Sequence, residues 1–156
     1  MTEATHPKKA QTERKVDVTW EGRLADGAGN IVSGTSGQIA NLPVSWAART
    51  EEAGGKTSPE ELLAAAHASC YAMALSFELE GRGAEAGSYQ VSATVGLDPK
   101  VGGGFEVSKS HLDVRGSVPD LDAAEFEAAA RAAAKGCPIS GALAGNVEIT
   151  VHASLS

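Results

Sequence analysis

The sequence predicts an α+β fold, with antiparallel sheets packed around long, central, buried helices. Three observations lead to this prediction. Several segments alternate apolar and polar residues, which is the period of a half-buried strand. One long segment in the middle of the chain is apolar on nearly every side, as a buried helix is. The predicted elements follow the order strands, helix, hairpin, helices and strand, rather than repeating βαβ units.

The length of 156 residues suits one domain with a single core. Residues 1–13 are polar and are expected to form a flexible N-terminal tail, whereas residues 14–156 are expected to form the domain. The chain contains no internal repeat and no low-complexity segment that would divide this region. We therefore expect one domain preceded by a tail.

The first part of the domain predicts a hairpin and a third strand. Apolar residues alternate over residues 14–24, and residues 31–36 are expected to return as the hairpin partner after a glycine-rich turn. A third short strand is expected within residues 38–46. Residues 49–56 are polar and rich in glycine, so they are expected to form a loop.

The central helix has the clearest start signal in the chain. Ser58 can cap the helix, Pro59 suits its first position, and the spacing from Ser58 to Glu61 fits a capping box. Gly81 is a plausible end. From Leu62 to Leu75 the helix is apolar on nearly every face. Such a helix is expected to be buried inside its protein or inside an oligomer.

The second half predicts a hairpin, two helices and a last strand. Glycines at the hairpin turn separate two alternating segments, and an alanine-rich helix follows, with Asp122 at its start. A second, short helix is expected to begin at a Cys-Pro pair. In chain order, these elements are expected at residues 89–97, 105–118, 122–136, 138–143 and 147–155.

Composition argues against several classes of function. The net charge is −7, whereas a protein that binds nucleic acid needs a basic face. The N-terminus has no apolar core of signal-peptide length, and the longest apolar stretch, residues 62–77, is short for a membrane span. We expect a cytoplasmic protein without nucleic-acid or membrane partners. In that compartment two cysteines are more often free, redox-active or metal-bound than permanently cross-linked.

The two cysteines have different predicted settings. Cys70 lies in the buried helix, where an unpaired cysteine more often packs as a small apolar residue than reacts. Cys137 stands between Gly136 and Pro138 at the expected start of a helix, where backbone N–H groups favour a negative sulfur. By position alone, both cysteines remain open to a structural or a reactive role.

Histidine near Cys70 leaves three alternatives open. His67 lies three residues before Cys70 on the same face, so it could be a base, a metal ligand or a hydrogen-bonded core residue. Cys70, Cys137, His67 and His111 could form a zinc site, but the chain has no Cys-x-x-Cys or His-x-x-x-His pair. We therefore expect no metal and no cofactor.

Three motifs together resemble a known family. The segment TSPEELLAAAHASCYAMALSFELEGRG, with CPIS downstream and VTWEGRL near the start, closely resembles the OsmC branch of the OsmC/Ohr hydroperoxide peroxidases from about Val16 onward. The resemblance implies an intertwined homodimer with two active sites at the subunit interface. It also implies that Cys70 is the peroxidatic cysteine and Cys137 the resolving one. Arg49 would lie beside Cys70, and Glu60 would hold that arginine.

The activity that this resemblance implies is the reduction of organic hydroperoxides, and less efficiently hydrogen peroxide, to alcohols. The reaction would pass through a Cys70 sulfenic acid and a Cys70–Cys137 disulfide. A dithiol, such as a lipoylated protein, would recycle the disulfide, and the role would be defence against oxidative and osmotic stress. The alternative is a non-enzymatic redox-sensing or binding domain of the same family. A hydrolase that pairs His67 with Cys70 is less favoured, because no oxyanion hole is evident.

Helix geometry limits how Glu60 can act. Ten residues separate Glu60 from Cys70. On one continuous helix this places them about 15 Å apart and about 80° apart around the axis. Either the helix begins after Glu60, or Glu60 serves the site of a partner subunit through Arg49. The apolar helix favours the second alternative, because a dimer would bury it.

Overall fold

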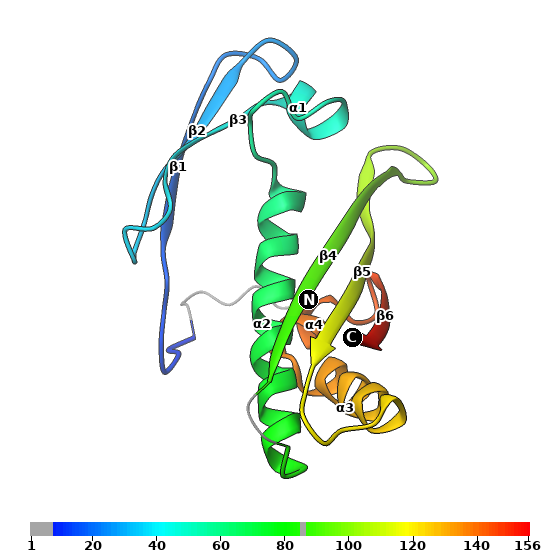
Figure 1. The fold of residues 1–156 in the computed structure, drawn as a ribbon. Coiled ribbons are helices and arrows are strands. Elements are labelled where there is room, and N and C mark those ends of the chain that lie inside the picture. Colours follow the sequence, from blue (N-terminus) through cyan, green and yellow to red (C-terminus); the bar gives the residue numbers. More distant parts are fainter. Residues whose placement is uncertain (1–7, 85–86) are drawn as a thin grey trace. The chain divides into compact units, whose positions relative to one another are not determined.

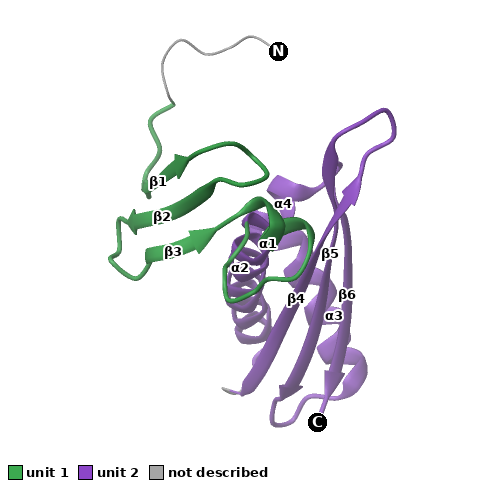
Figure 2. Cartoon of the chain, turned by 90° about the horizontal axis from the view of Figure 1, so that it is seen from above, with its two compact units in different colours: residues 1–58 green, residues 59–156 purple. Residues whose placement is uncertain are grey.

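The computed structural model describes residues 8–84 and 87–156. They belong to two compact units, residues 1–58 and residues 59–156, which Figure 2 shows in different colours. Of the predicted tail, residues 1–7 lie outside the described residues, and residues 8–13 are exposed and contain no helix or strand.

The first unit contains a three-stranded antiparallel sheet in the order β1-β2-β3. Its strands are β1 (Val16–Glu21), β2 (Ala28–Gly34) and β3 (Ala40–Val44), which confirms the predicted hairpin and third strand. Ile31 is buried, whereas the alternating apolar residues of β1, namely Val16, Val18 and Trp20, are exposed. The β1 strand therefore leaves apolar surface uncovered within the first unit.

A short helix replaces part of the predicted loop after β3. Helix α1 (Trp46–Thr50) contains Arg49, so the expected loop over residues 49–56 was wrong at its beginning. The Ser45 hydroxyl caps this helix by accepting a hydrogen bond of 3.1 Å from the backbone N–H of Ala48. The capping serine is the local signal for this turn, and that signal is weak in a sequence because serine is also common in loops.

The second unit contains a sheet in the order β4-β5-β6 with helices on one of its faces (Figure 1). The strands are β4 (Ser88–Pro99), β5 (Phe105–Ser117) and β6 (Glu148–Leu155), and the helices are α2 (Pro59–Gly81), α3 (Ala123–Gly136) and α4 (Pro138–Leu143). The α+β class is confirmed. The pairing of β5 with β6 is parallel, however, so this sheet is mixed rather than antiparallel. Helices α3 and α4 form the crossover that returns the chain to the same end of the sheet.

Alternate residues of β5 carry the core of the second unit. Leu112 and Val114 are fully buried and pack with Tyr71 and Leu75 of α2 and with Phe126 of α3. Residues between them on β5 face the other side of the sheet, as the two-residue period of a strand requires. Asp122 caps α3 and forms a capping box with Glu125. This packing fixes the middle of α2 against the sheet and against the start of α4.

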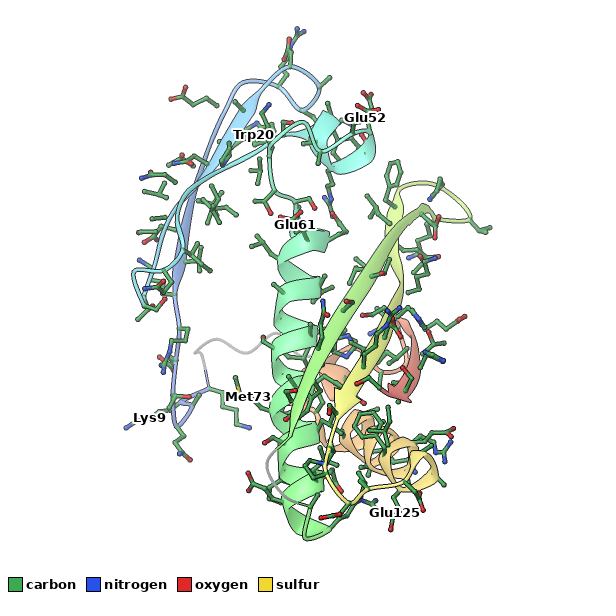
Figure 3. All side chains as sticks on the ribbon, viewed as in Figure 1. Lys9, Trp20, Glu52, Glu61, Met73 and Glu125 are labelled. Carbon is green, nitrogen blue, oxygen red and sulfur yellow. The ribbon has the colours of Figure 1, made fainter. Side chains whose placement is uncertain are left out.

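Helix α2 begins at Pro59, as its start signal predicts, and runs without interruption for 23 residues. By length and composition it could cross a membrane, but Tyr71, Leu75 and Leu79 belong to the protein core. The opposite side is uncovered: Met73 is 72% exposed and Phe77 is 75% exposed. Figure 3 shows Met73 on the side of α2 away from β4 and β5. Only one side of this apolar helix is therefore buried within the second unit.

Candidate active site

The two cysteines meet although they are far apart in the sequence. Cys70 lies in the middle of α2, and Cys137 ends α3 and caps α4. Both are free thiols, and their side chains are within hydrogen-bonding contact of each other. Cys137 is 1% exposed, whereas Cys70 is partly exposed. The fold therefore creates a pair of neighbouring thiols, one accessible and one enclosed.

Cys137 lies in a setting that stabilises a thiolate. Burial opposes its ionisation, but the pKa of Cys137 is lowered overall by hydrogen bonds from Ser140, from the Cys70 thiol and from the backbone N–H of Ile139. Ser140 contributes both its hydroxyl and its backbone N–H, whose nitrogen lies 3.5 Å from the sulfur of Cys137. The predicted position of this cysteine at a helix N-terminus is confirmed. The backbone N–H groups at that position act in the direction expected for a helix N-terminus.

The environment of Cys70 has the opposite effect. Burial raises the pKa of Cys70 above its ordinary value, the backbone N–H of Ile139 opposes that rise, and Cys137 reinforces it. The groups that act on this thiol within the described part of the second unit include no cation. Since a thiolate is the reactive form, Cys70 needs an additional positive group to react near neutral pH.

His67 is fully buried and bonded at both ring nitrogens. Its Nδ1 lies 2.6 Å from the hydroxyl oxygen of Ser110 on β5, and its Nε2 lies 2.7 Å from that of Ser140 on α4. Of the three alternatives, the hydrogen-bonded core residue matches this geometry. Neither nitrogen is left for a metal or for Cys70. In the described part of the chain, no cluster of three or more metal-ligating side chains occurs.

Acid is expected to destabilise the fold through His67. Burial lowers the pKa of His67 from 6.5, so the folded protein resists a proton that the unfolded chain accepts. Because the unfolded state then binds more protons, stability is present above about pH 6.5 and falls as the pH drops below it. Urea unfolding between about pH 7 and pH 5.5 should show this fall in the wild type and a smaller one in His67→Gln. His111→Gln should retain the full fall; equal slopes in all three proteins would contradict the assignment.

The two other predicted site residues lie on separate elements. Arg49 is in α1 of the first unit, and Glu60 is in the first turn of α2, where its side chain is buried. The helix includes both Glu60 and Cys70 without a break, so the alternative that the helix begins after Glu60 is wrong. The remaining alternative, in which Glu60 acts in the active site of a partner subunit, stays a prediction.

Comparison with known proteins identifies the family of this chain. Residues 52–152 match the model of the family described as OsmC-like protein. This segment includes α2, both cysteines, strands β4 and β5, and the first part of β6. The chain belongs to the OsmC-like family. The family resemblance inferred from the PEELLAAAHASC and CPIS motifs is therefore confirmed.

Individual OsmC-like and Ohr relatives extend the match to most of the chain. Peroxiredoxin OsmC of Escherichia coli strain K12 is 39% identical over 142 residues, which cover 91% of this chain and 96% of that protein. An organic hydroperoxide resistance protein of Xanthomonas axonopodis pv. citri is 32% identical over 99 residues, covering 63% of this chain and 67% of the relative. The crystal structure of the organic hydroperoxide resistance protein OhrB of Bacillus subtilis superimposes with a TM-score of 0.68 at 26% identity, over 90% of this chain and 98% of that one.

Two serines lie next to the candidate site, and neither was singled out from the sequence. Ser110 and Ser140 are buried and hold His67 between them. The CPIS motif contains Ser140, so its last residue was an available signal. For Ser110 the only signal in the sequence is the alternation of its strand. Alternation indicates that a residue faces the core, but it does not indicate which side chain that residue contacts.

Proposed function

We propose that this protein is a thiol-dependent peroxidase that reduces organic hydroperoxides, and less efficiently hydrogen peroxide, to alcohols. The observation that carries the proposal is the contact between a partly exposed Cys70 and an enclosed Cys137 whose pKa is lowered by its hydrogen-bond donors. Relatives named peroxiredoxin and organic hydroperoxide resistance protein support the same activity. The role would be defence against oxidative and osmotic stress in the cytoplasm.

The proposed reaction has three balanced steps. The Cys70 thiolate attacks the terminal oxygen of the hydroperoxide, the O–O bond breaks, and the alkoxide that leaves takes up a proton to become the alcohol. Cys70 is thereby oxidised to a sulfenic acid. The Cys137 thiolate attacks the Cys70 sulfur and expels hydroxide, which is protonated to water, and a disulfide forms. A dithiol, such as a lipoylated protein, then reduces the disulfide by thiol exchange and is itself oxidised.

Arg49 and Glu60 are proposed to make Cys70 reactive. Burial raises the pKa of Cys70, so the first step needs a cation beside its sulfur. An arginine can lower the pKa and hydrogen-bond the peroxide at the same time, and a carboxylate can orient that arginine. Arg49 is assigned the first role and Glu60 the second. The buried side chain of Glu60 fits this assignment, since buried carboxylates are almost always paired.

A homodimer is proposed as the working form. Apolar side chains are exposed on both units: Val16, Val18 and Trp20 on β1, and Met73 and Phe77 on α2. Exposed groups of this kind mark interaction surfaces in soluble proteins. Glu60 and Cys70 share one unbroken helix and are about 15 Å apart along it, so Glu60 is assigned to the site of the partner subunit. Arg49 would accompany it, giving each site residues from two chains.

Intact-protein mass spectrometry tests the assignment of both thiols. After one equivalent of cumene hydroperoxide, the wild type should lose two hydrogens, because a disulfide forms. The Cys137→Ser variant should instead gain one oxygen, because the sulfenic acid has no neighbouring thiol to attack it. The Cys70→Ser variant should keep its mass over the same period. Oxygen gain at Cys137 in that variant, at the wild-type rate, would show that the roles are reversed.

A further inference from the structure

A buried row of hydrogen-bonding groups ends at the sulfur of Cys137. It begins at the hydroxyl of Ser110 on β5, continues through the ring of His67 on α2, and reaches the hydroxyl of Ser140 on α4, with separations of 2.6 Å and 2.7 Å. The backbone N–H of Ser140 in turn donates to the sulfur of Cys137, with 3.5 Å between nitrogen and sulfur, and the Ser140 hydroxyl also lowers the pKa of that thiol. The three residues of this row are buried. The peroxidase mechanism proposed above gives no task to His67 or Ser110.

The direction of these hydrogen bonds depends on which ring nitrogen carries the proton. A buried histidine between two neutral hydroxyls is expected to be neutral, with one donor and one acceptor nitrogen. If Nδ1 carries the proton, the hydroxyl proton of Ser140 is used on Nε2 and cannot reach Cys137. If Nε2 carries it, the ring donates to the Ser140 oxygen, and the Ser140 proton can point at the sulfur. Ser110 then donates to Nδ1, so every donor has an acceptor.

A negative sulfur selects the second arrangement. A hydrogen bond to an ionised acceptor is about twice as strong as a neutral one. Donors aligned in a row also polarise one another in a low-dielectric interior. The arrangement in which all three donors point toward Cys137 is therefore favoured once that thiol has lost its proton.

We propose that Ser110, His67 in its Nε2–H form and Ser140 act as a donor relay that holds Cys137 as the resolving thiolate. Ser140 touches the reacting sulfur, whereas His67 and Ser110 are positioning residues that act through it. The inference deepens the proposed peroxidase function, since it explains how the second thiol is prepared. No proton leaves the relay: Cys137 loses its own proton to water before it attacks, and the hydroxyl of Ser140 remains protonated throughout.

The relay also determines which sulfur the reductant attacks. In thiol exchange, the better leaving group is the thiol with the lower pKa. When the reductant attacks the sulfur of Cys70, Cys137 leaves as a thiolate that the relay stabilises by hydrogen bonding. Attack on the sulfur of Cys137 is blocked because that residue is buried. The dithiol therefore forms its mixed disulfide with Cys70, and the Cys70–Cys137 S–S bond breaks as the new bond forms. The same row of donors assists both formation and reduction of the disulfide.

Other titratable groups near Cys137 are accounted for. Cys70 and Tyr71 of α2 interact with it, and His67 of the same helix is connected to it through Ser140. The Tyr71 hydroxyl donates to the backbone carbonyl of Ala130 at 2.8 Å, and burial followed by the charge of Cys137 raises the pKa of Tyr71. Tyr71 is thus neutral and its proton is engaged elsewhere. Its hydroxyl is buried on the same helix as His67 but lies outside the relay.

Titration of Cys137 tests the relay without any peroxide. The thiolate absorbance is followed against pH in a Cys70→Ser background, with the double variant lacking both thiols as the blank. Adding Ser140→Ala should move the titration to higher pH and leave about tenfold less thiolate on the acidic side of the curve. His67→Phe should have a similar effect, and His67→Gln, which keeps a donor and an acceptor, should restore much of the thiolate. Tyr71→Phe, the matched control, should leave the titration unchanged.

A second measurement uses the unaltered side chains. Nitrogen NMR shifts of the histidine ring distinguish the two neutral tautomers, and the relay requires His67 to carry its proton on Nε2. A proton on Nδ1 would overturn the proposal, as would an unchanged Cys137 titration in Ser140→Ala and His67→Phe. Neither measurement depends on peroxide turnover. A functioning relay in a protein without peroxidase activity would therefore refute the proposed function alone.

Discussion

Replacing Cys70 with serine is expected to abolish peroxide consumption, with a loss on the order of a thousandfold or more. A serine hydroxyl has nearly the same size as a thiol, but it is not ionised near neutral pH and does not form a stable oxidised intermediate with a peroxide. Steady-state consumption of cumene or tert-butyl hydroperoxide, with a dithiol in excess, measures the effect. Cys70 lies partly exposed on α2, so the substitution should leave the core of the second unit intact.

Cys137→Ser is the matched comparison, because it removes the other thiol of the same pair. Its first turnover should keep nearly the wild-type rate, since Cys70 attacks the peroxide alone. Later turnovers should slow, and excess peroxide should drive Cys70 to sulfinic acid, which the disulfide otherwise prevents. Full activity in Cys70→Ser would refute the peroxidase. One oxidation per wild-type chain, with no further turnover under excess dithiol, would instead favour a redox-sensing or binding domain.

Local signals predicted most of the fold. The start of α2 at Pro59, the cap of α3 at Asp122 and the start of α4 at Pro138 were all indicated by residues within one turn of each boundary. The predictions were wrong where a local signal was weak, or where strand pairing depends on residues that are distant in the sequence. Ser45 alone distinguishes α1 from a loop. The parallel pairing of β6 depends on the path of the two helices before it, which alternation within the strand does not encode.

The candidate site could be predicted only in part. The helix-start position of Cys137 followed from its neighbours Gly136 and Pro138, and the lowered pKa follows from that position. The contact between Cys70 and Cys137 did not follow from spacing; the family resemblance supplied it. His67 lies 43 residues from Ser110 and 73 residues from Ser140 in the chain. Hydrogen bonds over such separations exist only after the sheet and helices have packed.

A complementation experiment should show that each active site uses two subunits. Arg49→Ala is expected to lower activity by about a hundred- to a thousandfold, the usual effect of losing one strong donor at a reacting group. Cys70→Ser chains are inactive for a different reason. When the two variants are co-expressed with different tags and the mixed dimer is purified, one of its two sites should combine a native Cys70 with the partner's native Arg49. The mixed dimer should therefore have about half of the wild-type activity.

The reason for this expectation lies in the geometry of α2 and in the environment of Cys70. Glu60 and Cys70 of one chain are separated by about 15 Å along the axis of α2. The groups that set the pKa of Cys70 in the described part of the second unit include no cation. If Arg49 instead served the Cys70 of its own chain, both sites of the mixed dimer would lack one residue, and activity would not return. That result would refute the shared site while leaving the peroxidase chemistry intact.

The structure provides a matched negative control for complementation. Cys70 and Cys137 contact each other within one chain, so a mixed dimer of Cys70→Ser and Cys137→Ser chains contains no complete thiol pair. Its steady-state activity should not exceed that of the Cys137→Ser dimer. Activity that returns in the mixed dimer with Arg49→Ala, but not in the mixed dimer of the two cysteine variants, would support the proposed shared site. In that site the thiols and their relay come from one chain, and the activating arginine comes from the other. Recovery in both pairings would show that the thiols also cross between subunits, contrary to the contact within the chain.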